Sequence, residues 1–243
     1  MSAPDPRPAA DAQYYARLAG FLYLATNATA IFAFAMRGRV LDLASAEHSS
    51  AAIAAAPRLL RLSIAGELVT VAGVLVLVAS LYVVLERVDR SLAFIATLWR
   101  IAENAVLAVT TFNASALLMA SGGGDAAASV RLVGLFTGVY GAGYQAGFFF
   151  LGLGSTLFSW LWWRSRWVPR AIAGWGIFAS LVMALGSLAL IVAPELRPAI
   201  GMAYMGPMGV YELGLGLWLL VRGIGAAAPS RSQAEREASI PTT

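Results

Sequence analysis

The sequence predicts an all-α membrane protein, a polytopic bundle of six transmembrane helices. Hydrophobic residues make up 59% of the 243 residues and charged residues only 12%, whereas about a quarter of the residues of a soluble domain are charged. Six apolar stretches are each about as long as the roughly 20 residues that cross a bilayer as a helix. The chain lacks the alternation of a transmembrane β-barrel, so helices must satisfy the backbone in lipid.

Charged residues mark the ends of the six apolar stretches. The predicted transmembrane domain covers residues 16–225, between a polar N-terminal tail at 1–15 and a disordered C-terminal tail at 226–243. The six predicted spans cover about 17–37, 62–85, 92–119, 138–163, 170–193 and 199–222. The uncharged stretch 132–163 exceeds one span. We therefore expect its glycine-rich first third to lie before the membrane or to kink into it.

The distribution of arginine predicts the orientation, because cytoplasmic ends of membrane helices carry the excess of positive charge. One side of the predicted bundle carries seven arginines near the membrane and the other side six. The seven are Arg17, Arg87, Arg90, Arg164, Arg166, Arg170 and Arg222. Four tryptophans at 160–167 form an aromatic belt on the same side. Both termini are therefore expected in the cytoplasm, and the chain in the plasma membrane.

The composition also narrows the chemistry. All 17 basic residues are arginines, and they stand singly or in short groups at span ends, where snorkelling side chains lie. The pI of about 9.8 therefore does not predict nucleic-acid binding. The chain has no cysteine, which excludes disulfides and thiolate metal sites. We predict no metal and no cofactor, and membrane lipids are the expected surroundings.

Four charged residues lie inside the predicted spans away from the span ends, namely Glu67, Arg100, Glu103 and Glu212. A charge at bilayer depth costs roughly 2.5 to 3.5 kcal/mol on insertion scales, so each needs a partner or a function. Arg100 and Glu103 lie on the third span, in a polar stripe that includes Asn104. Such a stripe must face protein or water.

The spacing predicts how these charges are neutralised. Arg100 and Glu103 are one helical turn apart and can pair. By depth, Arg100 could also reach Glu212, which follows a helix break at Gly206 and Pro207. One arginine against three carboxylates leaves an excess of two negative charges. At least one glutamate should thus be protonated, open to water or paired with an outside arginine such as Arg61.

Three classes of function remain open. The first is a protein that binds or transports a small or lipid-like ligand at the buried cluster of Arg100, Glu103, Glu67, Glu212 and Asn104. The second is an intramembrane enzyme that uses glutamates for acid-base chemistry; this is less favoured, and no residue is assigned as catalytic. The third is a structural or interaction subunit whose charges lock helices together.

Several glycine pairs predict close helix packing. Gly134 with Gly138, and Gly143 with Gly147, have the spacing at which two backbones can approach each other. The partner helix can belong to the same chain or to a second copy. Oligomerisation through the glycine-rich faces is therefore possible in principle.

The order of several short motifs resembles one protein family. They are Arg17 to Gly20; Arg90 to Ala93 leading to Arg100 and Glu103; Phe150 to Gly154; Arg164 to Arg166 through Pro169 and Arg170 into Gly174 to Gly176; and Glu212 ahead of Leu217 to Leu220 and Gly223. Together they resemble the bacterial domain-of-unknown-function family numbered 4386, over about residues 16–225. The resemblance implies a six-helix integral membrane protein and no established activity.

Overall fold

The computed structural model describes residues 10–42, 45–122 and 125–225. Every regular element in these residues is a helix, which confirms the predicted all-α class. The helices are α1 (Ala10–Arg37), α2 (Ala46–Ala55), α3 (Pro57–Leu85), α4 (Arg90–Ser121), α5 (Ala126–Ser165), α6 (Arg170–Val192), η1 (Pro194–Leu196), α7 (Arg197–Ile200), η2 (Ala203–Met205) and α8 (Gly206–Val221). Residues 1–9 of the predicted polar tail, and the tail predicted to be disordered at 226–243, lie outside the described residues.

Five helices, α1, α3, α4, α5 and α6, are long and apolar enough to cross a membrane. The sixth predicted span, 199–222, is not one helix. It is divided into α7, η2 and α8, and α8 has 16 residues, which gives a length of about 24 Å. Gly201 has a φ of 53°, a conformation that favours glycine, and it ends α7. Pro207 lies in the first turn of α8, where a proline is tolerated.

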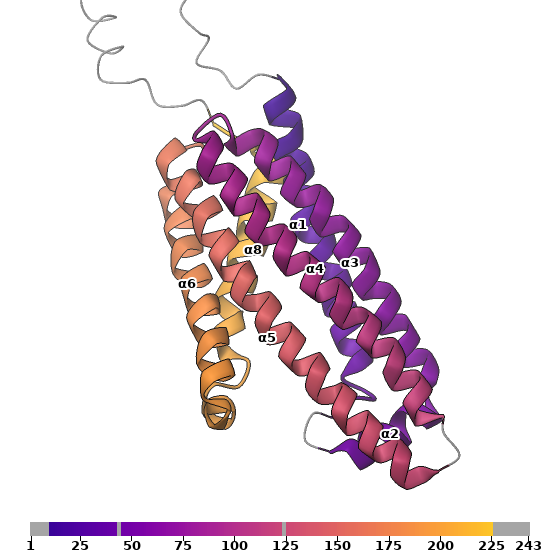
Figure 1. Ribbon diagram of the computed structural model, residues 1–243. Helices are drawn as coiled ribbons and strands as arrows, with labels where there is room; N and C mark the ends of the chain where they lie inside the picture. Colours follow the sequence, from indigo (N-terminus) through magenta and orange to yellow (C-terminus); the bar gives the residue numbers. More distant parts are fainter. Residues whose placement is uncertain (1–9, 43–44, 123–124, 226–243) are drawn as a thin grey trace, which may run out of the picture.

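The first and last long helices lie side by side, so the two ends of the described chain meet (Figure 1). A Cβ atom on Gly20 would lie 2.4 Å from the backbone nitrogen of Leu220, so only glycine permits this approach. At the end of the bundle, the side chain of Gln13 accepts a hydrogen bond of 3.0 Å from the Ile224 N–H. It also donates one of 3.4 Å to the Arg222 carbonyl.

Helix α5 runs diagonally across the whole bundle as one continuous helix of 40 residues (Figure 1). Its length is about 60 Å, roughly twice the hydrocarbon thickness of a bilayer. Several of its glycines allow close packing against neighbouring helices. A Cβ on Gly143 would meet Thr110 of α4, and one on Gly152 would lie 2.6 Å from the Ala184 nitrogen of α6. The predicted span started at residue 138, whereas α5 begins 12 residues earlier, at Ala126.

The structure tests the glycine pairs one residue at a time. A Cβ on Gly147 would lie 2.9 Å from Leu107, so Gly143 and Gly147 both pack closely on α4 as predicted. Gly134 lies against Ala46 of α2. Gly138 does not pack on a helix within the described chain, because a Cβ there would meet no atom within 4 Å.

Buried side chains form two apolar cores. The larger core joins α1, α3, α4, α5, α6 and α8, and includes Leu81, Phe158 and Trp162. The smaller core lies at the opposite end from the termini, where α2 packs beneath α4 and α5 (Figure 1). It includes Ile53 and Leu117. The buried polar residues described next lie between these two cores and within the larger one.

A polar contact fixes the loop between α3 and α4. Asp89 caps α4 by accepting a hydrogen bond from the Leu92 backbone N–H, and it pairs with Arg164 at 3.0 Å. The backbone hydrogen bond from Leu92, together with the bond from Arg164, lowers the pKa of the Asp89 carboxyl. The pair is partly exposed, so it contributes little to stability.

Candidate functional site

The polar stripe on α4 faces the inside of the bundle, as predicted. Arg100 is 3% exposed, Glu103 4%, Asn104 3% and Thr111 2%. Helix α4 begins at Arg90, so these residues follow its first three turns. Burial of this many polar groups requires partners from other helices. The partners divide the predicted cluster into two separate groups.

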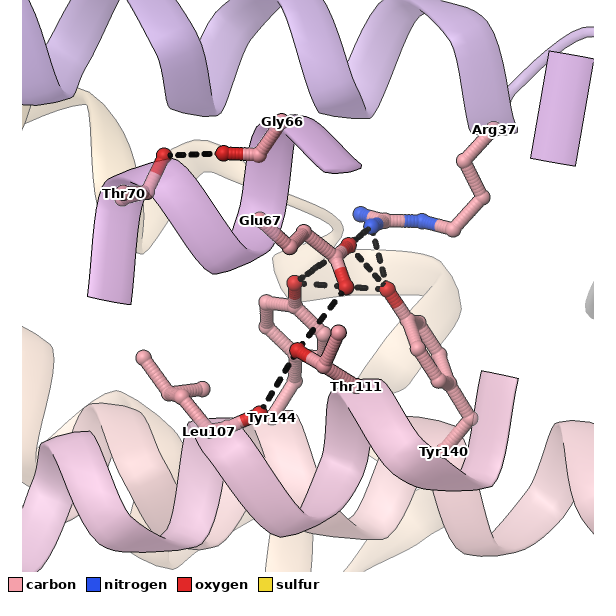
Figure 2. Close-up of polar contacts among 8 residues, drawn as sticks. All are labelled: Arg37, Gly66, Glu67, Thr70, Leu107, Thr111, Tyr140 and Tyr144. Atoms are coloured by element: carbon pink, nitrogen blue, oxygen red, sulfur yellow. Dashed lines mark hydrogen bonds and ion pairs between the residues drawn. The ribbon is translucent and has the colours of Figure 1, made fainter. Parts of the chain in front are cut away.

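The first group is built around Glu67 (Figure 2). Arg37, the last residue of α1, forms an ion pair with the Glu67 carboxylate. The hydroxyls of Tyr140 and Tyr144 on α5 donate to the same carboxylate oxygen, Oε1, the latter at 2.8 Å. Thr111 on α4 donates to the other oxygen, Oε2, at 3.2 Å. Four helices therefore meet at one carboxylate.

Aromatic rings enclose the arginine of this group. The guanidinium carbon of Arg37 lies 4.9 Å from the ring centroid of Tyr140, 5.0 Å from that of Tyr144 and 5.4 Å from that of Phe34. These are cation–π distances. The side chains of Arg37 and Glu67 are only 11% and 7% exposed. Both oxygens of Glu67 lie within hydrogen-bond distance of donors, and the single hydroxyl hydrogen of Thr111 is shared between Glu67 and the Leu107 carbonyl. The geometry of this group is that of a structural lock.

The partner of Glu67 is therefore Arg37, and the suggested pairing with Arg61 is wrong. The reason is the position of Arg61 around the helix axis. Arg61 precedes Glu67 by six residues on α3, which places the two residues about 120° apart around the helix at 100° per residue. Arg37 comes from a neighbouring helix, α1, that packs along α3.

The second group is built around Arg100. Its Nη1 lies 3.0 Å from Glu103 Oε2, which confirms the predicted pair. The same nitrogen donates to Ser155 Oγ of α5 at 3.3 Å. Gly154 makes room for the arginine stem, since a Cβ there would lie 2.7 Å from Arg100 Cγ. The absence of a side chain at one position of α5 thus positions the charge on α4.

Glu212 belongs to this second group without touching Arg100. It accepts a hydrogen bond of 3.1 Å from Asn27 Nδ2 of α1. Arg100 and Glu103 both lie close enough to Glu212 for an electrostatic interaction. Within the described part of the chain, no cation pairs with Glu212 at ion-pair distance. The direct contact that depth permitted between Arg100 and Glu212 does not form, because Glu103 and Ser155 hold the guanidinium.

Two acceptor atoms of the second group lack hydrogen-bond donors. Asn104 donates to the Val71 carbonyl at 2.9 Å, but its Oδ1 is buried and has no partner among the described residues. Glu103 Oε2 is also buried and accepts no hydrogen bond from the described residues, although this oxygen is ion-paired with Arg100. Buried acceptors without donors are costly. The second group therefore differs from the first in having capacity for a further donor.

The two groups lie at different depths. Glu67 precedes the end of α3 by 18 residues, which is about 27 Å from the end of the bundle that holds the termini. Arg100 is 10 residues from that end of α4 and Glu212 nine residues from that end of α8, which is about 15 Å and about 14 Å. The charge count changes accordingly. Two arginines, Arg37 and Arg100, stand against three glutamates, so the excess is one negative charge, and it falls in the second group.

Sequence reasoning missed five contributors: Arg37, Tyr140, Tyr144, Asn27 and Ser155. Arg37 resembled an ordinary arginine at a span end. The spacing of Tyr140 and Tyr144, four residues apart inside a glycine-rich helix, places both hydroxyls on one face and was the available signal. In the parts of the chain that the structure describes, no three His, Asp or Glu side chains form a group that could hold a metal ion.

The fold and the buried charges define a polytopic helical membrane protein with an ionic network at two depths. The chain belongs to the family described as a domain of unknown function (DUF4386), whose model matches residues 18–223. This match begins within α1 and extends past the end of α8. The comparisons with curated proteins and with solved structures gave no match.

Proposed function

We propose that this chain is a bacterial plasma-membrane protein with six spans and both termini in the cytoplasm. Five long apolar helices and the return of α8 beside α1 support an even number of crossings. The short α8 can cross together with the turns that precede it, because η2 continues directly into it. The tryptophans and arginines at 160–170 support the orientation.

Reporter fusions test this topology. Fusions after Arg90 and after Arg222 are expected to give the same, cytoplasmic signal, since both sites lie at the end of the bundle that holds the termini. A fusion after Ala56, between α2 and α3, should give the opposite signal. Opposite signals after Arg90 and Arg222 would contradict the six-span count, and two external signals would reverse the orientation.

The proposed activity is binding or transport of a small ligand at the second group. The observation that carries it is the unbalanced carboxylate: Glu212 has an amide donor, Asn27, but no ion-paired arginine among the described residues. Asn104 Oδ1 adds a buried acceptor without a hydrogen bond, and Glu103 Oε2 is held only by its ion pair with Arg100. Such a site favours a positively charged or donor-rich ligand, or a proton. Proton exchange at Glu212 would link ligand binding to pH.

The contacts of the first group favour a structural role for its own residues. Glu67, Arg37 and the two tyrosines use their donors and acceptors on one another. They form a lock between helices and are not the proposed ligand site. An intramembrane enzyme has less support, because Ser155, the serine of the second group, accepts a hydrogen bond from the Arg100 guanidinium and has no general base bonded to it among the described residues.

Carbodiimide labelling tests the role of Glu212. A hydrophobic carbodiimide reacts with protonated carboxyl groups, so Glu212 of the wild type is expected to be labelled more at low pH than at high pH. Peptide mapping by mass spectrometry identifies the modified residue. Glu67 should stay unlabelled, because its carboxylate is held by Arg37 and two tyrosines. Glu212→Gln should abolish the signal in the membrane domain.

The matched control is Glu195→Gln, which removes an exposed carboxylate from η1 and should leave Glu212 labelling unchanged. Failure to label Glu212 at any pH, in protein that remains folded, would contradict the proposal and favour a purely structural network. A mass spectrum of small molecules released from the purified protein then identifies the ligand. A cationic metabolite lost in Glu212→Gln is the expected result.

A further inference from the structure

A groove lies at the end of the bundle farthest from the termini, where α5 and α6 separate (Figure 1). Its volume is about 580 Å³, within the roughly 300 to 1,000 Å³ of ligand sites. One wall is α5, and the other is formed by Leu190 and Ile191 of α6 with η1 and the start of α7. It shares no residue with the two groups of charges, so the inference is independent of the proposed function.

The α5 wall of the groove includes a glycine face at Gly138 and Gly141 that no described helix covers. A Cβ on Gly138 or on Gly141 would meet no atom within 4 Å. At the α5 glycines 143, 147, 152 and 154, a neighbouring side chain or backbone occupies the space that a Cβ would take. The smooth, open strip of backbone beside exposed Ile191 fits an extended hydrocarbon chain.

A buried hydroxyl on the same wall points to a ligand with an acceptor. Thr137 lines the groove and is only 5% exposed. Its Oγ1 has no hydrogen-bond partner in the described residues. Most buried hydroxyls have a partner. The ester carbonyl of a glycerolipid is an acceptor of the right kind for this donor.

Two side chains of opposite charge line the groove. Arg197, the first residue of α7, and Asp42, between α1 and α2, both line it and are exposed. Arginine at a helix end binds phosphate well and lies at headgroup level in membrane proteins. We propose that the groove binds one aminophospholipid of the phosphatidylethanolamine type. An acyl chain lies along Gly138 and Gly141, the phosphate contacts Arg197 and the ammonium group contacts Asp42.

Native mass spectrometry of the detergent-purified protein, after exchange into nanodiscs of phosphatidylethanolamine, tests the site. The wild type is expected to retain one lipid. Gly141→Leu fills the groove without displacing protein atoms, and retention should fall about tenfold, which corresponds to about 1.4 kcal/mol in affinity. The matched control is Gly214→Leu on α8, also with open space around its Cβ but outside the groove. It should retain the lipid.

Two further variants test the headgroup and remain informative if Gly141→Leu does not fold. Arg197→Gln should weaken retention of every phospholipid. Asp42→Asn should remove only the preference for phosphatidylethanolamine over phosphatidylglycerol. The proposal is overturned if Gly141→Leu retains lipid as well as Gly214→Leu does, or if the headgroup variants change nothing. It is also overturned if Gly141→Leu alters the oligomeric state while lipid retention stays constant, because the groove would then seat a second copy.

Discussion

Replacing Glu67 with glutamine is expected to destabilise the protein by about 3 to 5 kcal/mol, because it leaves the charge of Arg37 buried and uncompensated. Three aromatic rings and two hydroxyls surround the guanidinium, but none of them carries the neutralising charge. The glutamine has nearly the same shape, so packing is preserved. The measurement is the free energy of unfolding in mild detergent with added denaturant.

A double variant isolates the charge from the side chains. Arg37→Gln combined with Glu67→Gln should recover a large part of the loss, since a neutral pair in this site is less costly than one unpaired charge. Tyr144→Phe removes a single hydroxyl and should cost about 1 kcal/mol. Asp89→Asn breaks the exposed pair with Arg164 and should have little effect. Wild-type stability in Glu67→Gln would show that Arg37 does not depend on this carboxylate.

The second large effect is expected at the ion pair of Arg100 and Glu103. Glu103→Gln should destabilise the protein, and adding Arg100→Gln should restore part of the stability. Glu212 moderates the single change, because it remains within electrostatic range of Arg100. The double variant Glu103→Gln with Glu212→Gln removes both carboxylates and should therefore cost more than the sum of the two single changes. The same denaturation measurement provides all four values.

Additivity of Glu103→Gln and Glu212→Gln would contradict this interpretation, because residues that share a partner are expected to be non-additive. The cycle also separates function from stability. Glu212→Gln alone should remove the carbodiimide label with a small stability change, whereas Glu103→Gln should have the larger effect on stability. A large loss in Glu212→Gln alone would place Glu212 among the structural charges.

The parts of the site that the sequence predicts are local ones. Arg100 and Glu103 lie on one helix at a spacing that fixes their distance once the segment is helical. The stripe on α4 is predictable for the same reason. The pairing of Glu67 with Arg37 joins residues 30 positions apart, and Arg37 lies at a span end where most arginines face the headgroups. Nothing in the local pattern distinguishes it from Arg39.

The fold, too, is predictable in its local features and not in its tertiary ones. Apolar length and charge predict five of the long helices, because hydrophobic spans must satisfy their own backbone. The division of the segment 199–222 depends on Gly201 and Pro207 acting together with the packing of α8 on α1, which is a tertiary effect. For α5, the glycines suggested a kink, but most of them are sites of close contact that leave the helix continuous. Only a three-dimensional view tells a glycine that packs, such as Gly143, from one that faces open space, such as Gly138.

The unbroken course of α5 joins the two depths mechanically. Tyr144, which holds Glu67, and Ser155, which holds Arg100, are 11 residues apart on this one rod, or about 17 Å. A rotation of the rod about its own axis moves both hydroxyls together. A rotation of α5 that breaks the hydrogen bond of Tyr144 to Glu67 would therefore also displace Ser155 from Arg100.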